Sequence, residues 1–288
     1  MKKLIFSPPI NKLYRHIQER LLSRIYQWKY AKQFEKVSVY VMFLGYPRSG
    51  HTLIGALLNA HPETCIAHEL NALKFIQKGN TQNQLFAKII GRNKWFNARN
   101  QMWTGYSYKV PNQWQGQFRR LKTIGDKRGG ASSRRLTQHP ELLDKLHQII
   151  DKEIRIIHNQ RNPFDNIATR ARGGNIHRKA VDEQQLYKVI DEHFRDVATI
   201  DRILKSNKYQ ILTISHEDFL EDPILQLTKM CNFIGVEPYE DYLKDATSIV
   251  RKKAHKSRHN IHWPEDAKNL VMKEIAKYDF LQGYNFDN

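Results

Sequence analysis

The segment Ser38-Val-Tyr-Val-Met-Phe-Leu44 is almost entirely apolar or β-branched, and it leads directly into Gly45-Tyr-Pro-Arg-Ser-Gly-His-Thr52. A nearly unbroken apolar run is typical of a strand that is buried on both faces of a parallel sheet. Residues 52–59 then have a helical pattern, which His61-Pro62 ends. The order of strand, glycine loop and helix is the first half of a βαβ unit, so it predicts an α/β protein.

The rest of the chain continues this alternation. Ile154-Arg-Ile-Ile-His158 and residues 209–215 predict two more sheet strands, while residues 69–100 and 182–205 predict helices. Residues 95–135 have a poor pattern in which glycines, glutamines and basic residues alternate, so we expect loops there. The predicted fold is α/β, with a mostly parallel central sheet flanked by helices, of the P-loop nucleotide-binding type.

Composition restricts the class of protein. The chain has 288 residues, of which 40% are hydrophobic, and only two cysteines, Cys65 and Cys231, which we expect to be reduced and buried. No run approaches the roughly 18 apolar residues of a membrane span, so we expect a soluble, cytoplasmic protein. The net charge of +18 predicts an anionic partner.

The first 36 residues form a basic segment with helical periodicity. Its apolar residues recur at spacings of four and three, which places them on one face: Leu13, Ile17, Leu21, Ile25 and Trp28. We expect this helix, residues 1–36, to pack its stripe on a single domain formed by residues 37–288. The alternative is peripheral contact with an anionic membrane surface.

The loop from Gly45 to Thr52 has the length and frame of a Walker A loop, G-x-x-x-x-G-K-[ST], with His51 in place of the lysine. Successive backbone N–H groups and the start of the next helix can cradle a phosphate-like dianion. The missing lysine, and the lack of a convincing acidic partner for Mg²⁺, indicate a nucleotide with one phosphate-like group at its 5′ end. The alternative is a turn that only connects strand to helix.

The residues from Tyr46 to Thr52 resemble the 5′-phosphosulfate loop of the sulfotransferase family that uses 3′-phosphoadenosine 5′-phosphosulfate (PAPS), written Y-P-[KR]-S-G-[TS]-[TS]. His51 departs from this pattern, because a hydroxyl residue is usual there. The resemblance implies that the following residues bind the nucleotide: Arg48, Ser49, Gly50, His51, Thr52 and Leu53.

A second segment, from Ile156 to Thr169, resembles the 3′-phosphate motif of the same family, an apolar strand that ends in R-[ND]-P-x-D. The resemblance implies that Arg161 and Thr169 bind the 3′-phosphate, and the planar guanidinium suits bidentate contact with phosphate oxygens. The family often has a basic loop near the C-terminus that closes over the nucleotide. Our candidates for that loop are Lys256, Ser257 and Arg258, although a solvated basic loop would have the same composition.

Sulfuryl transfer resembles phosphoryl transfer, in which nucleophile and leaving group lie in line and positioned charges stabilise the transition state. Arg48 is expected to stabilise charge on the bridging oxygen. The family uses a glutamate or a histidine as general base, and we favour Glu69 over its neighbour His68. Within the region of poor pattern, residues 121–125 predict a short strand that Lys127 follows. The family often has a lysine at the end of the corresponding strand that faces the sulfuryl group, so the resemblance implies this role for Lys127. The alternative is that Lys127 is one charge among many in a basic stretch.

The sequence therefore predicts a sulfotransferase that moves a sulfuryl group from PAPS to a hydroxyl acceptor, in preference to an amine, by in-line transfer with a general base and without a metal. A sugar, lipid, peptide or small-molecule acceptor remains open, and residues 71–135 are expected to select it. The alternatives are a degenerate P-loop kinase or NTPase, and a basic nucleic-acid-binding protein, for which no recognition motif is visible.

Overall fold

The computed structural model describes residues 8–173, 180–251 and 254–288, with side chains from residue 21 onward. Its centre is a five-stranded sheet with the order β2-β5-β1-β6-β7, in which every neighbouring pair is parallel. The strands are β1 (Val39–Gly45), β2 (Thr64–Ala67), β5 (Thr123–Asp126), β6 (Glu153–Gln160) and β7 (Gln210–Ser215). The predicted parallel α/β sheet is therefore confirmed.

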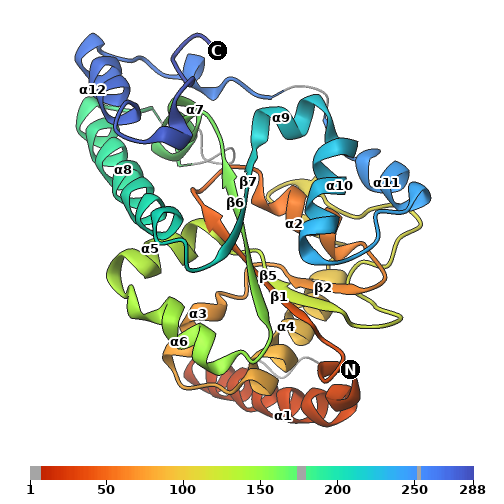
Figure 1. Ribbon diagram of the computed structural model, residues 1–288. Helices are drawn as coiled ribbons and strands as arrows, with labels where there is room; N and C mark the ends of the chain where they lie inside the picture. The colour runs from red at the N-terminus through yellow and green to blue at the C-terminus, as the bar shows by residue number, and fades with distance from the viewer. Residues whose placement is uncertain (1–7, 174–179, 252–253) are drawn as a thin grey trace.

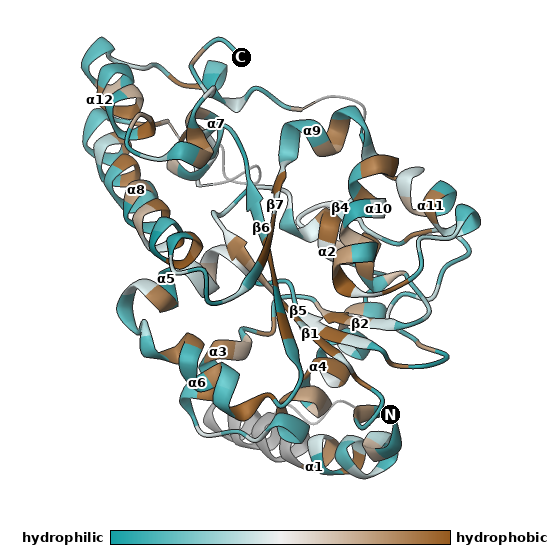
Figure 2. Cartoon of the chain, viewed as in Figure 1, coloured by the Kyte–Doolittle hydropathy of each residue, from teal (hydrophilic) through white to brown (hydrophobic). Residues whose placement is uncertain are grey.

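Helices cover both faces of this sheet (Figure 1). Alternate residues of β1 belong to different hydrophobic cores, Tyr40, Met42 and Leu44 to one and Val39, Val41 and Phe43 to the other. This is why the strand is apolar at every position rather than at every second one. Figure 2 shows hydrophobic residues along much of the central strands and hydrophilic residues on the outer face of α8.

The first core is shared by eight helices: α1 (Pro8–Phe34), α3 (Ala72–Gln77), α4 (Gln82–Asn97), α5 (Gly129–Gln138), α6 (Glu141–Ile149), α7 (Pro163–Ala171), α8 (Glu183–Lys205) and α12 (Glu265–Ile275). The second core is built on α2 (His51–Asn59), α9 (His216–Glu221), α10 (Pro223–Ile234) and α11 (Glu240–Thr247). A short hairpin, β3 (Met102–Trp103) and β4 (Tyr106–Ser107), and the 3₁₀ helices η1 (Ser257–Asn260) and η2 (Asp279–Leu281) complete the described elements.

The extents of the helices differ from the sequence prediction in two regions. The helical stretch expected at residues 69–100 is divided into α3 and α4, between which Gly79 has a positive φ of 76°. Helix α5 forms where loops were expected. Its sequence, GGASSRRLTQ, has little apolar periodicity, but the Ser133 hydroxyl accepts from the Gly45 N–H at 3.1 Å and donates to the Gly45 carbonyl at 2.8 Å. Tertiary contact with β1, rather than local pattern, therefore defines this helix.

Helix α1 contacts the rest of the molecule through a face that the sequence pattern did not select. Tyr30 packs edge-on against Phe118 at 5.6 Å, and Phe34 against Phe86 at 5.5 Å.

The stripe expected to be buried is exposed: Leu21 is 54%, Ile25 52% and Trp28 84% accessible. The prediction of a packed stripe is therefore wrong for these three residues. The side chains of Leu13 and Ile17 lie outside the described residues, and the division at residue 36 stays a prediction. Within the part of the chain that the structure describes, no helix is long and apolar enough to cross a membrane.

Candidate active site

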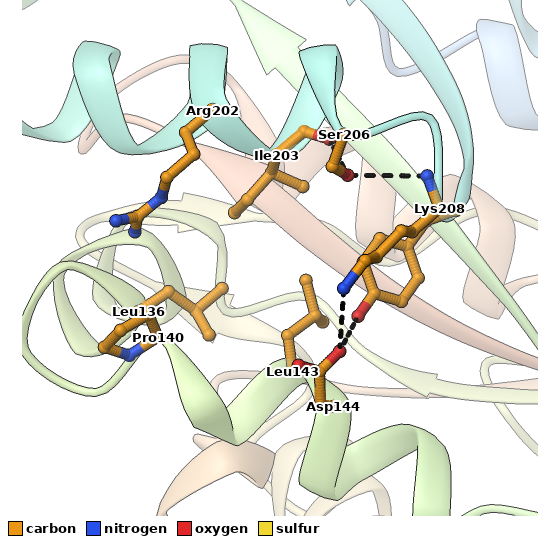
Figure 3. Close-up of a pocket in the computed structure, with 9 residues that line it drawn as sticks. Leu136, Pro140, Leu143, Asp144, Arg202, Ile203, Ser206 and Lys208 are labelled. Atoms are coloured by element: carbon orange, nitrogen blue, oxygen red, sulfur yellow. Dashed lines mark hydrogen bonds and ion pairs between the residues drawn. The ribbon is translucent and has the colours of Figure 1, made fainter.

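Parallel strands place their carboxyl ends at one edge of the sheet, where ligands of open α/β folds bind. A cavity of about 990 Å³ opens there, and its walls come from the loops after β1, β5 and β6, from the β3–β4 hairpin and from the segment before η1. A smaller cavity of about 130 Å³ lies between α5, α6 and α8, where Lys208 and Tyr209 both contact Asp144 (Figure 3). The large cavity is the candidate active site, because it is lined by the glycine loop of residues 45–52, which is the candidate phosphate loop and is called the phosphate loop below.

The phosphate loop has the geometry of an anion cradle. Arg48 and Gly50 both have positive φ, 73° and 85°, and Gly50 caps α2 without a side-chain hydrogen bond. No side chain caps α2. The Leu53 N–H donates to the Gly50 carbonyl at 3.0 Å, so the N–H groups of His51 and Thr52 are the ones available to an anion. A Cβ on Gly50 would lie 2.7 Å from a ring nitrogen of His216, so the tight turn requires glycine there. Pro47, Arg48, Gly50, His51, Thr52 and Leu53 line the cavity.

Ser49 belongs to the phosphate loop, but it does not line the cavity. Its side chain is buried, donates to the Tyr46 carbonyl at 3.1 Å and contacts the Asn166 amide. The Asn159 amide also donates to the Ser49 carbonyl. The Ser49 hydroxyl therefore fixes the shape of the loop, and ligand contact at this residue would come from its backbone.

His51, the departure from the family pattern, is packed as a structural residue. Its Nε2 lies 3.2 Å from the Leu44 carbonyl oxygen, and its ring occupies the space in which a Cβ on Gly45 or Gly129 would lie, at 2.6 Å and 2.1 Å. Burial lowers the pKa of His51 to about 4. His51 is therefore neutral at pH 7, and it does not supply the cation of a Walker A lysine.

A second set of polar groups, Arg161, Thr169 and Ser257, lies next to the phosphate loop on the wall of the same cavity. Arg161 donates to the Arg48 carbonyl at 2.9 Å and to the Ser257 hydroxyl at 3.4 Å, and it lines the cavity with Ser257 and Thr169. The Thr169 hydroxyl and the Arg161 Nε are buried, and neither has a hydrogen-bond partner among the described residues. Buried polar groups are normally paired, and because both residues line the cavity, a polar ligand bound there would be placed to supply the partners.

The other two residues proposed from the C-terminal loop lie elsewhere. Lys256 is exposed and donates to the Asp287 carbonyl at 2.8 Å. Arg258 is 2% accessible, donates its backbone N–H to Asp165 at 2.9 Å and its guanidinium to the Asn285 carbonyl at 3.2 Å. Neither side chain lines the cavity. Both attach the C-terminal segment to the domain, while Lys252 and Lys253 of the same loop lie outside the described residues.

The proposed catalytic residues come together beside α2. Lys127 is almost fully buried, and its Nζ donates to the Thr52 hydroxyl at 2.8 Å and to Glu69 Oε1 at 2.9 Å. Arg128 contacts the other carboxylate oxygen at 3.1 Å. Burial alone would raise the pKa of Glu69, but the charges of Lys127 and Arg128 outweigh it and lower the pKa to about 2. Glu69 is therefore ionised. The Lys127 ammonium lies between its carboxylate and the Thr52 hydroxyl of the phosphate loop.

Asp126 is a site residue that the sequence analysis missed. Its two carboxylate oxygens accept from the backbone N–H groups of Leu70 at 2.9 Å and Ala72 at 2.8 Å. These bonds fix the turn in which Glu69 has a positive φ of 54°. The sequence shows Asp126 beside the candidate Lys127. It does not show which distant backbone N–H groups the carboxylate binds, because such contacts leave no local sequence signal.

His68 does not line the cavity, although Glu69 does. Its ring is 3% accessible, stacks on Phe96 with ring centroids 3.9 Å apart and meets Trp103 edge-on. Burial lowers the pKa of His68 to about 3, and the nearby charge of Lys127 acts in the same direction. This arrangement favours Glu69 as the general base, and the assignment stays a prediction.

The cavity is strongly basic. Seven of its lining residues are arginine or lysine: Arg48, Lys127, Arg128, Arg134, Arg161, Arg172 and Arg251. Among the lining residues that the structure describes, Glu69 is the one acid. Arg251 also lies over the Tyr106 ring at 4.8 Å, which connects the C-terminal loop with the β3–β4 hairpin. The cavity therefore suits a ligand with several negative charges.

A sequence model described as the sulfotransferase family matches residues 41–241. Among solved structures, the sulfotransferase domain from the curacin biosynthetic pathway has a TM-score of 0.50 at 15% identity, over 84% of this chain and 98% of its own. Sulfotransferase STF9 from Mycobacterium avium has a TM-score of 0.50 at 10% identity, over 90% and 82%. At these identities the likeness shows the fold. No curated protein matches the sequence.

The family match spans more than half of the chain and includes both the phosphate loop and Arg161. The protein therefore belongs to the sulfotransferase family.

Buried histidines near the site make stability depend on pH. Burial lowers the pKa of His193 to about 3, and His193 packs against Tyr46 of the phosphate loop with ring centroids 4.7 Å apart. Neither ring nitrogen has a partner among the described residues. A histidine whose folded pKa lies below its unfolded value of about 6.5 takes up a proton on unfolding. Stability is therefore full above pH 6.5 and falls as the pH decreases toward 3.

We predict that His193→Phe reduces this pH dependence. Removing one such group should lessen the fall in unfolding free energy by up to about 1.4 kcal/mol per pH unit between pH 5.5 and 4.5. Urea unfolding at several pH values measures the slope, and His262→Gln, at an exposed histidine, is the control. An unchanged slope in His193→Phe would show that His193 is protonated in the folded protein.

Proposed function

We propose that the protein transfers a sulfuryl group from PAPS to a hydroxyl acceptor. The observation that carries this proposal is that two separate sets of hydrogen-bond donors, each suited to an anion, line one cavity. One is the phosphate loop at the start of α2, and the other is Arg161 with Thr169 and Ser257. A nucleotide with oxyanions at both its 5′ and 3′ positions would contact both sets. A nucleoside triphosphate would leave the second set without a partner.

The residues present fit such a nucleotide. The backbone N–H groups after Gly50, with Arg48 and Thr52, would hold the phosphosulfate end. The unpaired hydroxyl of Thr169 and the Nε of Arg161 would donate to the 3′-phosphate, together with Ser257. Charge-assisted bonds of this kind are about twice as strong as neutral ones.

The chemistry would use the contact between Lys127 and Glu69. An acceptor oxygen forms a new bond to sulfur while the bond between sulfur and the bridging oxygen breaks, and both electrons stay with the departing phosphate. Glu69 takes the proton of the acceptor. Lys127, which already contacts Thr52, would turn toward the anionic sulfuryl group and so weaken its pairing with Glu69. The basicity of Glu69 would then rise at the stage at which it must accept a proton.

The kinase or NTPase alternative has less support. His51 is a buried neutral ring in the lysine position. Asp126 ends β5 beside the loop, where a carboxylate for Mg²⁺ would be sought, but both its oxygens are occupied by backbone N–H groups.

The desulfated product, 3′-phosphoadenosine 5′-phosphate, should bind without metal and stabilise the fold. At 100 times its Kd, binding would add about 2.7 kcal/mol to the free energy of unfolding. Thermal-shift titration against ATP with Mg²⁺ and against AMP tests this. If ATP binds as tightly as the 3′-phosphorylated nucleotide, the proposed function is wrong.

Arg161→Ala should weaken binding of 3′-phosphoadenosine 5′-phosphate far more than binding of AMP. The lost charge-assisted contact is worth about 1.5–3 kcal/mol, or roughly 10- to 150-fold in Kd. Calorimetry with both ligands gives the ratio, and Lys256→Ala, outside the cavity, is the matched control. Equal losses for the two nucleotides would show that Arg161 does not bind the 3′-phosphate.

Glu69→Gln should depress sulfuryl transfer by about 10²–10⁴-fold and leave nucleotide affinity nearly intact, because the amide keeps the shape of the side chain but cannot accept the proton. The measurement is single-turnover transfer from PAPS to an acceptor identified by screening, with His68→Asn in parallel. A large fall for His68→Asn alone would transfer the role of base to His68. No fall in either variant would place the base outside this pair.

A further inference from the structure

The outward face of α1 carries a line of exposed apolar side chains. Leu21, Ile25 and Trp28 are spaced by four and three residues, and their accessibilities are 54%, 52% and 84%. The adjacent Leu22 is 45% accessible. The opposite face, with Tyr26, Tyr30 and Phe34, already packs on the protein. Hydrophobic side chains gathered on one face, rather than scattered singly, mark an interaction surface.

Basic side chains flank this line. Arg24, Lys29, Lys32 and Lys36 are all exposed, and between residues 21 and 36 Glu35 is the one acid. An apolar centre with a cationic border is the composition of a helix that lies in the interface of an anionic bilayer. The apolar side chains enter the acyl boundary, while the long lysine and arginine side chains reach the headgroups. We propose that this face, defined by Leu21, Ile25 and Trp28 with its basic border, binds the surface of anionic lipid membranes.

Charge distinguishes this partner from a second copy of the chain. If two α1 faces met, the basic borders of both helices would be brought together, and between residues 21 and 36 each copy has Glu35 as its one acid. Like charges in such contact oppose association. An anionic lipid surface satisfies both the apolar centre and the basic border.

The position of α1 sets the orientation of the bound protein. The helix ends at Phe34, and β1 begins five residues later at Val39, so α1 lies at the amino ends of the strands (Figure 1). The active-site cavity opens at their carboxyl ends. A protein that rests on its α1 face would therefore keep the cavity toward water. Lipid binding would localise the enzyme without placing its active site against the bilayer.

The test is co-sedimentation of the full chain with vesicles of phosphatidylcholine alone, or of phosphatidylcholine mixed with phosphatidylglycerol. We expect binding to the anionic vesicles that is at least about tenfold stronger than to the neutral ones and that weakens as salt is added. The double variant Ile25→Ser/Trp28→Ser should lose most of this binding. Both side chains are exposed, so the fold should persist.

The matched control is Ile224→Ser/Leu225→Ser, which removes an exposed apolar pair on α10 whose accessibilities are 51% and 46%. It should bind anionic vesicles as the parent does. The proposal is overturned if the parent does not bind them, or if Ile25→Ser/Trp28→Ser binds equally well. Light scattering that shows a dimer dissociated by the same double variant would assign the face to a second copy instead. The experiment needs no nucleotide, so its outcome is independent of the proposed function.

Discussion

Parallel pairing of β1 with β5 on one side and β6 on the other is the constraint on which the site depends. The register aligns Met42 with both Asp126 and Ile156, so the segments that follow the three strands emerge at one edge. The phosphate loop, Lys127 and Arg161 come from these three segments. A backbone hydrogen-bond ladder thus brings together residues that are more than 100 positions apart in the chain. Continuous apolar residues on both faces of β1 hold that ladder between two cores.

Buried charge then organises the site within this frame. Asp126 uses both carboxylate oxygens to fix the turn of Glu69, while the next residue, Lys127, connects Glu69 to Thr52. Removing one partner of a buried pair leaves an uncompensated charge, which is costly. The group of Asp126, Glu69 and Lys127 is therefore both a structural unit and the place where proton transfer and charge stabilisation would occur. Its neighbours His51 and His68 are neutral, so the available cations near the loop are arginine and lysine.

Basic side chains gather on two surfaces of the protein. In the cavity, arginine and lysine line the walls with one acid among the described lining residues. On α1, basic side chains surround an exposed apolar line. These surfaces lie at opposite ends of the strands, so a nucleotide in one and a lipid surface on the other would not compete for the same cations. Part of the excess of basic residues is in this respect concentrated on two distinct surfaces.

The sequence by itself determined the parallel sheet, the phosphate loop and the position of Arg161, because each depends on a local pattern: an unbroken apolar run, a glycine spacing, and a capped helix after a strand. The tertiary structure decided which face of α1 is buried, that α5 is a helix, and that His68 is packed away while Glu69 faces the cavity. It also revealed the role of Asp126 and separated Ser257 from Lys256 and Arg258. The physical reason is that burial and pairing depend on contacts between residues distant in the chain. Periodicity shows that a helix has an apolar face, but the available partners decide which face packs.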